Sequence, residues 1–286
     1  GQADANAQIE FALQAGVNFI DTAEMYAVPP TADTYGTTEA IIGNWLAANP
    51  SRRDELVLAS KIAGNGLPWI RGGADIDGNN IVSSIDDSLR RLQTDYIDLY
   101  QLHWPNRTSP HFAKHWPGML QFSSVDTQQH IDGMLDILRS LDDCIQAGKI
   151  RHFGLSDDTP WCISTYLSLA EQHHLPRPVS IQNEFSLLHS KDWPYLIETC
   201  VHQDLAYLPW SPLGGGVLSG KYIDGQRPPG SRWNATQRNG LFRDTAAVNK
   251  AVKEYASIAA DQQLTTAQLA LAWCAQVDGV TSTIIG

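Results

Sequence analysis

Two hydrophobic patterns alternate along the chain. In one, apolar residues recur with the spacing of an amphipathic helix; the other consists of short apolar runs typical of buried strands. Helices are predicted over Ala3–Ala15, Thr37–Ala48, Ile81–Leu92, His130–Ala147, Pro160–Gln172, Lys191–Gln203, Thr245–Ala260 and Thr265–Ala275. Strands are predicted over Val17–Asp21, Leu56–Lys61, Tyr96–His103, Ile150–Ser156, Val179–Phe185, Leu205–Ser211 and Thr281–Ile285. Every predicted strand is therefore preceded by a helix.

This alternation indicates parallel strands joined by helical crossovers, either in a doubly wound sheet or in an eight-stranded barrel. The predicted strands are one short of a barrel, and the missing one would precede the first helix. The chain also stops at a strand, where a barrel would add a helix. We predict an α/β fold of the (β/α)8 TIM-barrel class. It would form one domain over residues 1–286, as a fragment lacking its first strand and last helix.

Composition narrows the classes of partner. The chain has 286 residues, 43% of them hydrophobic, and a formal net charge of −11. That charge argues against nonspecific binding to nucleic acid or to an anionic membrane. The four cysteines form no C-x-x-C pair, so neither a zinc site nor a disulfide framework is indicated. With no apolar run long enough for a span and no leader pattern, we expect a cytoplasmic protein.

Polar residues close several predicted strands, where the loops of a barrel build its site. Asp21, Lys61 and His103 close three consecutive strands, and Tyr26 lies on the loop after the first. Each has a structural explanation when taken alone: a turn cap, a lysine reaching to water, a hydrogen-bonded core histidine or a surface aromatic. Further polar strand ends are Ser156 with Asp157, Gln182 to Glu184, and Trp210 with Ser211.

A single chemistry joins the first four residues. A tyrosine phenol, with a reference pKa of about 10, is a weak acid at neutral pH, and a nearby ammonium lowers that pKa by stabilising the phenolate. Lys61 would do this beside Tyr26, while Asp21 would keep the lysine charged and oriented. His103 could hydrogen-bond a carbonyl oxygen that receives the proton. Because no side chain donates hydride, reduction of that carbonyl requires a nicotinamide cofactor.

Specific motifs continue this pattern along nearly the whole chain: FIDTAEMY, LVLASKI, YIDLYQLHWP, AGKIRHFGLS, SIQNEFSLL and LPWSPLGGGVLSGKY. In these motifs and their order the chain resembles the aldo-keto reductases, and it is similar to the bacterial Tas-type branch of that family. The resemblance implies an oxidoreductase that reduces aldehydes or ketones with NADP(H), with NAD(H) as the alternative. It implies a small-molecule carbonyl substrate and no metal.

The resemblance also implies roles for individual residues. Asp21, Tyr26, Lys61 and His103 match the catalytic tetrad, with Tyr26 as proton donor. The positions that match cofactor-binding residues are Ser156, Asp157, Gln182, Trp210, Ser211, Leu213, Gly215, Lys221 and Arg232. In the family, the first serine and the glutamine hold the nicotinamide carboxamide, the aromatic position stacks on the ring, and the two basic positions clamp phosphates.

Two departures from the family pattern bear on cofactor recognition. The family motif is usually Ser-Asn where this chain has Ser156-Asp157, and an ionised aspartate cannot donate a hydrogen bond to the carboxamide oxygen. The family's Gly-Thr cofactor turn would precede residue 1, and the segment that reads the adenosine 2′-phosphate would follow Gly286. The preference for NADP(H) over NAD(H) is therefore open at this stage.

The long loop over residues 104–129 contains several aromatic residues. Loops of this length after a strand are commonly functional, although an aromatic cluster packed on the barrel rim is the structural alternative. We expect Trp104 to line a substrate pocket because it directly follows His103.

Two other classes of function compete with the reductase. The first is a regulatory or redox-sensing nucleotide-binding module, as in the potassium-channel β subunits of the same family. Those subunits depart from the catalytic histidine, which this chain retains as His103. The second is a metal-dependent barrel hydrolase using Asp21, His103 and Glu184. That class lacks its usual H-x-H pair in this sequence and would leave Lys61 idle.

Overall fold

The structure is a computed structural model that describes residues 1–112, 114, 118–234 and 243–285. The chain divides into two compact units. Unit 1 comprises residues 1–109 and 117–179, and unit 2 comprises residues 110–116 and 180–286. The single domain predicted over residues 1–286 stays a prediction. No helix within the described residues is both long enough and apolar enough to cross a membrane.

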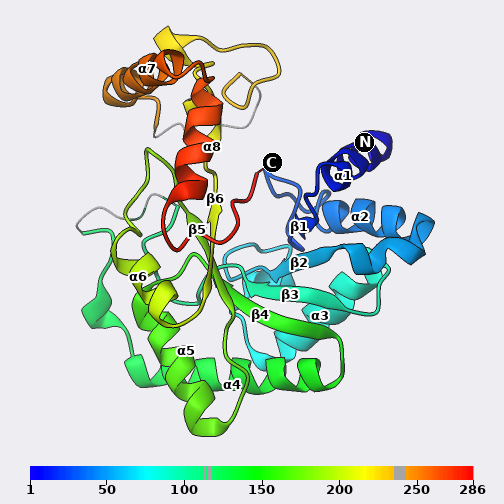
Figure 1. The fold of residues 1–286 in the computed structure, drawn as a ribbon. Coiled ribbons are helices and arrows are strands. Elements are labelled where there is room, and N and C mark those ends of the chain that lie inside the picture. Colours follow the sequence, from blue (N-terminus) through cyan, green and yellow to red (C-terminus); the bar gives the residue numbers. More distant parts are fainter. Residues whose placement is uncertain (113, 115–117, 235–242, 286) are drawn as a thin grey trace. The chain divides into compact units, whose positions relative to one another are not determined.

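Unit 1 alternates helices with parallel strands (Figure 1). Its elements are α1 (Gln2–Gln14), β1 (Phe19–Asp21), α2 (Thr37–Ala48), β2 (Val57–Ile62), α3 (Gly78–Leu92), β3 (Ile97–Leu102), α4 (Thr127–Gln146), β4 (Ile150–Ser156) and α5 (Pro160–His173). The strands pair in chain order, and the register sets Lys61 beside Gln101. These elements match the predicted ones to within three residues at each end.

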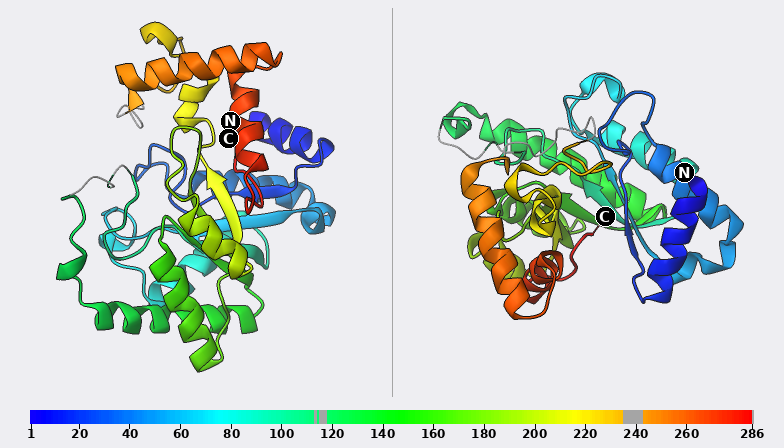
Figure 2. Two further views of the ribbon diagram at one scale, coloured as in Figure 1. Left: turned by 60° about the vertical axis from the view of Figure 1, so that its left-hand side comes forward. Right: turned by 90° about the horizontal axis from the view of Figure 1, so that it is seen from above.

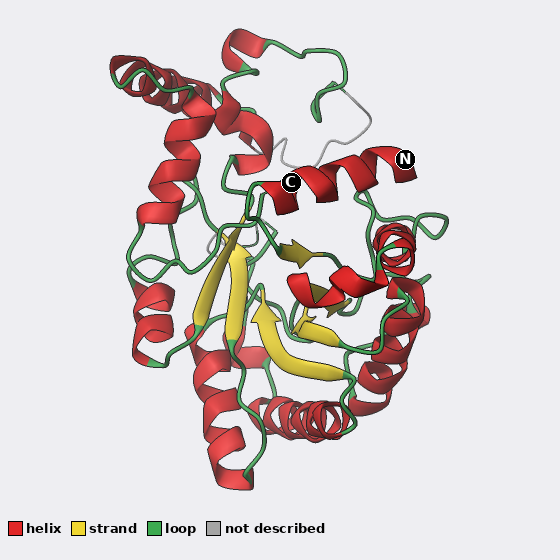
Figure 3. Cartoon of the chain, turned by 45° about the vertical axis from the view of Figure 1, so that its right-hand side comes forward, coloured by secondary structure: helices red, strands yellow, loops and turns green. Residues whose placement is uncertain are grey.

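Strands β2 and β3 lie in the interior of unit 1, although each also carries polar side chains such as Lys61 and Gln101. Every residue of β3 is buried, as is every residue of β2 except Val57. Such runs are typical of a parallel sheet that packs against helices. Helices α2 to α5 pack against one another in chain order, and α3 and α4 contact the strands (Figure 3). Asp77 caps α3 by accepting a hydrogen bond from the Asn80 amide at 2.7 Å.

Unit 2 contains the last two described strands and a helical core. Its elements are β5 (Ser180–Glu184), α6 (Tyr195–His202), β6 (Ala206–Trp210), the short 3-10 helix η4 (Gly214–Ser219), α7 (Ala246–Asp261) and α8 (Thr266–Gln276). Strands β5 and β6 are parallel. Helix α8 packs against α7 and η4, around Leu218, Val252 and Ala270 (Figure 2).

Two predicted elements of unit 2 differ from the structure. Thr281–Ile285 is not a regular strand, but it runs beside β6, since the amides of Thr281 and Ile284 donate to the carbonyls of Tyr207 and Pro209 at 2.9 and 2.8 Å. The helix predicted from Lys191 begins only at Tyr195. Pro194, which has no amide hydrogen to donate, lies at the N-cap and suits the start of a helix rather than its interior.

We predict that Gly43→Ala destabilises the protein because α2 and α3 touch there. A methyl group at Gly43 would lie 2.1 Å from the Arg91 carbonyl oxygen, which is backbone and cannot rotate away. Overpacking of this kind costs about 1–3 kcal/mol. Urea unfolding followed by circular dichroism would measure the loss in free energy of unfolding.

The matched control is Gly133→Ala in α4, where nothing lies within 4 Å of the added methyl group. Alanine is a better helix former than glycine by about 1 kcal/mol, so this variant should be as stable as the parent or more stable. Equal effects of the two substitutions would show that the α2–α3 contact is not tight.

Candidate functional site

The carboxyl ends of three neighbouring strands bring the predicted tetrad together within unit 1. Asp21 is the last residue of β1, Lys61 lies one residue before the end of β2, and His103 directly follows β3. Parallel strands in chain order place these ends along the same edge of the sheet. Tyr26 comes from the loop that follows β1.

Lys61 and Asp21 form a buried ion pair. The Lys61 ammonium donates to Asp21 Oδ2 at 2.5 Å and to the Thr22 carbonyl at 2.8 Å, and the Lys61 side chain has no exposed surface. Asp21 Oδ1 accepts a second bond, at 2.9 Å, from the side-chain amide of Gln101. Burial lowers the pKa of Lys61, but the charge of Asp21 and its hydrogen bond outweigh burial and raise that pKa overall. The lysine is therefore a cation at neutral pH.

Tyr26 lies close to both Lys61 and His103. The Lys61 ammonium is 5.3 Å from the centre of the Tyr26 ring, and the His103 ring centre is 5.7 Å away with its plane turned by 77°. We expected an acidified phenol, but burial raises the pKa of Tyr26 above its ordinary value. Lys61 lowers that pKa as predicted, while Asp21 and Asp157 raise it further. Desolvation of the phenolate, which depends on burial, outweighs the charge of Lys61.

His103 is held neutral. Burial, and then the neighbouring charge of Lys61, keep the pKa of His103 well below its ordinary value. Within the described residues its Nδ1 is buried without a hydrogen-bond partner. A neutral imidazole has one donor and one acceptor nitrogen. It can therefore offer a hydrogen bond to an oxygen without supplying a charge.

Beside His103, Trp104 packs tightly against the loop after β2. Its ring centre lies 4.9 Å from that of His103, and its indole nitrogen donates to the Asn65 carbonyl at 3.2 Å. A methyl group on Gly64 would lie 2.2 Å from the same nitrogen, so only glycine fits there with the indole in this position. The indole N–H is therefore engaged by the protein itself.

A second buried carboxylate, Glu24, fixes the loop that carries Tyr26. Glu24 is fully buried and accepts two hydrogen bonds from Arg71, at 2.6 and 2.9 Å. It also accepts from the Ala63 amide at 2.6 Å and the Ser84 hydroxyl at 2.7 Å. These bonds tie the loop after β1 to the loop after β2 and to helix α3. Tyr26, two residues after Glu24, is thereby held on a rigid turn.

The loops after β3 and β4 are also joined. Arg107 forms an ion pair with Asp158, and Ser109 Oγ donates to the Asp157 carbonyl at 3.2 Å. Asp157 is buried, has a left-handed backbone with φ of 53°, and follows the buried Ser156 at the end of β4. The two predicted carboxamide residues of unit 1 thus lie on a fixed turn, and the charge of Asp157 acts on Tyr26.

Unit 2 contains the other predicted cofactor residues. Gln182 is buried in β5, Trp210 ends β6, and Ser211 adopts a left-handed backbone with φ of 52°. The ring of Trp210 lies 6.3 Å from that of Phe112. Leu213 precedes η4 and supplies the carbonyl that accepts from the Gly216 amide at 3.0 Å. Apart from Gln182 in β5, these residues occupy the end of β6 and the turn that follows it.

The turn after β6 has the features of a phosphate-binding loop. Gly214, Gly215 and Gly216 all have positive φ, which lets the backbone approach a ligand closely. A methyl group on Gly215 would lie 3.4 Å from the Arg232 guanidinium, and one on Gly216 would lie 3.2 Å from the Lys221 ammonium. Two exposed cations beside a glycine-rich turn fit the phosphates of a nucleotide cofactor.

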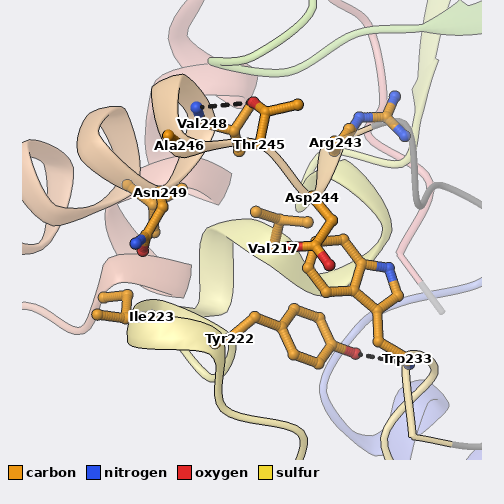
Figure 4. Close-up of a pocket in the computed structure, with 12 residues that line it drawn as sticks. Val217, Tyr222, Ile223, Trp233, Arg243, Asp244, Thr245, Ala246, Val248 and Asn249 are labelled. Atoms are coloured by element: carbon orange, nitrogen blue, oxygen red, sulfur yellow. Dashed lines mark hydrogen bonds between the residues drawn. The ribbon is translucent and has the colours of Figure 1, made fainter.

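Unit 2 also has a cavity of about 230 Å³ between the residues after η4 and the start of α7 (Figure 4). Tyr222 and Trp233 stack there with ring centres 4.2 Å apart, and Thr245 caps α7 by accepting from the Val248 amide. Among the residues described, none of the predicted site positions lines this cavity. The same part of the chain has no cluster of three or more histidine, cysteine or acidic side chains able to hold a metal ion.

Sequence reasoning missed Gln101, Glu24 and Gly64. Gln101 had a readable signal, because it lies two residues before His103 in an apolar strand and so points to the same face. Glu24 and Gly64 lie in loops, and their roles depend on contacts with residues distant in sequence. No pattern in the neighbouring sequence indicates such contacts.

Comparison with known proteins gives consistent matches. The family described as "Aldo/keto reductase family" matches residues 2–286. The chain is 42% identical to "Protein tas" of Escherichia coli (strain K12) over 288 residues, covering all of this chain and 81% of that protein. It is 36% identical to "Aldo-keto reductase" of Babesia bovis over 81% of this chain and 85% of that one. It is 30% identical to "Probable voltage-gated potassium channel subunit beta" of Oryza sativa subsp. japonica over 99% and 77%.

The neutral, buried His103 predicts a loss of stability on acidification. Below about pH 6.5 an unfolded histidine binds a proton that native His103 does not bind. The unfolded state then holds more protons, so the free energy of unfolding falls by up to about 1.4 kcal/mol per pH unit. Urea unfolding at a series of pH values should show that His103→Gln is less sensitive to acid than the parent.

The control is His173→Gln, which removes an exposed histidine from the end of α5. It should leave the acid sensitivity as in the parent. If His103→Gln and the parent lose stability in parallel below pH 6.5, native His103 is protonated and our assignment of a neutral ring is wrong.

Proposed function

We propose, from the premise that this chain belongs to the aldo/keto reductase family, that it reduces aldehyde or ketone carbonyls to alcohols with hydride from NADP(H). Family membership also confirms the predicted α/β, TIM-barrel class. The observation that carries the proposal is the fully buried Lys61, paired with Asp21, beside Tyr26 and a neutral His103. Burial of a lysine costs free energy, so a lysine held charged beside a phenol suggests a chemical role.

Tyr26 would donate the proton that completes the reduction. As its O–H proton moves to the substrate oxygen, the phenolate that forms is stabilised by the charge of Lys61. The raised pKa of Tyr26 keeps the phenol protonated at neutral pH, as a proton donor must be. His103, as a neutral imidazole, would donate a hydrogen bond to the same oxygen and help to orient the carbonyl carbon.

The cofactor would supply the hydride that the side chains lack. In unit 1 the buried Ser156 would hold the nicotinamide carboxamide, and Asp157 would accept a hydrogen bond from the carboxamide NH2 group. In unit 2 the family positions are Gln182 for the carboxamide, Trp210 for the ring, the turn with Ser211, Leu213 and Gly215 for the pyrophosphate, and Lys221 and Arg232 for phosphates. The glycine-rich turn and its two cations support this assignment. NAD(H) remains the alternative cofactor.

The substrate is proposed to be a small carbonyl compound with an apolar or aromatic group. Trp104 engages its own N–H with the Asn65 carbonyl, so it offers a ligand its ring and no donor. A cytoplasmic location is part of this proposal. In support, Cys144, Cys162, Cys200 and Cys274 are buried free thiols, the form expected in a reducing compartment.

Tyr26→Phe tests the proposed reaction. Loss of a general acid lowers turnover by about 100-fold or more, while the affinity for NADPH should change little because the ring is kept. NADPH absorbance with 4-nitrobenzaldehyde measures turnover, and quenching of tryptophan fluorescence by NADPH measures binding. The exposed Tyr195→Phe is the control for loss of a phenol in general.

The same assay separates the reductase from a regulatory nucleotide-binding module. A parent protein that binds NADPH but turns over no aldehyde would support the module. Equal losses of turnover and NADPH affinity in Tyr26→Phe would contradict the role of proton donor.

Gly64→Ala tests Trp104 as the wall of the substrate pocket. The added methyl group cannot coexist with the indole in its present position, so Trp104 must move. We expect KM for aromatic aldehydes to rise about tenfold, as in Trp104→Ala, with the affinity for NADPH nearly unchanged. An unchanged KM in both variants would exclude Trp104 from the pocket.

A further inference from the structure

Gln101 of β3 reaches over the neighbouring strand β2 to the ion pair between Lys61 and Asp21. It lies in β3 and is fully buried, and in the sheet register it stands beside Lys61 of β2. Its side-chain amide donates to Asp21 Oδ1, on β1, at 2.9 Å. Lys61 thus donates to Oδ2 of Asp21 and Gln101 donates to its Oδ1.

The chemistry of the two groups fixes the direction of this bond. An ionised carboxylate only accepts hydrogen bonds, so Gln101 must turn its NH2 group towards Asp21. A hydrogen bond to a buried charged group is among the stronger ones in a protein. Gln101 lies in β3 two residues before His103, which directly follows the strand, so it points to the face on which the proposed chemistry takes place.

We propose that Gln101 is a positioning residue for carbonyl reduction, holding Asp21 in the orientation in which it binds Lys61 beside Tyr26. The inference rests on the proposed function. In this assignment Gln101 acts through Asp21, which accepts a hydrogen bond from its side-chain amide at 2.9 Å. Its effect therefore belongs to the proton-transfer step and leaves cofactor binding unaffected.

Removal of this bond has a defined electrostatic direction. Without the Gln101 donor, the negative charge of Asp21 is less well compensated, so it acts more strongly on the neighbouring side chains. That charge already raises the pKa of Tyr26 and of Lys61. The phenol should become a weaker acid, so proton donation slows and the alkaline limb of the rate profile moves to higher pH.

Gln101→Met is the direct test, because methionine keeps the length of the side chain and removes the donor. The readout is the single-turnover rate of NADPH oxidation with 4-nitrobenzaldehyde, which product release does not limit. We expect a fall of about tenfold or more, as for loss of a hydrogen bond to a charged group. KM for NADPH should stay within about twofold, since binding is not involved.

The matched control is Leu99→Met, a buried substitution of similar volume on the same face of β3. If Gln101 were merely structural, both methionine variants would lose thermal stability alike and keep the parent rate and pH profile. That result would overturn the proposal.

Gln101→Glu supplies a second, independent readout, and it decides the question if the methionine variant fails to fold. The introduced carboxyl group can donate to Asp21 only when protonated, so the rate should rise as the pH falls. A pH profile like that of the parent would overturn the proposal.

The outcomes for Tyr26 and Gln101 are distinguishable. A parent protein without aldehyde turnover overturns the proposed function and the role of Gln101 with it. An active parent, an inactive Tyr26→Phe and a fully active Gln101→Met overturn only the role of Gln101.

Discussion

A lysine ammonium with no exposed surface is the constraint around which the site in unit 1 is organised. Its charge is tolerated only because Asp21 and the Thr22 carbonyl receive it at 2.5 and 2.8 Å. Asp21 must in turn be held, which the strand register achieves by placing Gln101 of β3 within reach of β1. The same cation acts on its two neighbours. It opposes the rise in the pKa of Tyr26 and helps to keep His103 neutral.

Rigidity of the loops follows from a second set of buried charges. Glu24 is saturated by Arg71, Ser84 and the Ala63 amide, so the turn that carries Tyr26 cannot shift without leaving an unpaired carboxylate. Such ion pairs contribute little net stability compared with apolar packing. Their value here is geometric, because they fix one arrangement of the loops after β1 and β2.

Much of unit 1 could be predicted from the sequence, because apolar periodicity and parallel pairing are local or repetitive signals. The closeness of Asp21, Lys61 and His103 could be predicted for the same reason, since strand ends collect at one edge of a parallel sheet. What could not be predicted depends on three-dimensional surroundings. The pKa of Tyr26 depends on burial. The role of Glu24 depends on the guanidinium of Arg71, 47 residues away, and the need for glycine at position 64 depends on the indole of Trp104. The segment Thr281–Ile285 pairs with β6 without the regular geometry of a strand, a distinction that composition alone does not make.

The contacts of Arg107 with Asp158 and of Ser109 with Asp157 join two loops that follow different strands. In evolutionary terms these loops are a linked pair. A change in the length or course of one loop would remove the ion-pair partner of a buried charge on the other, so the two loops have to change together. If loops were exchanged between relatives in the laboratory, the segments after β3 and β4 would have to be transplanted together.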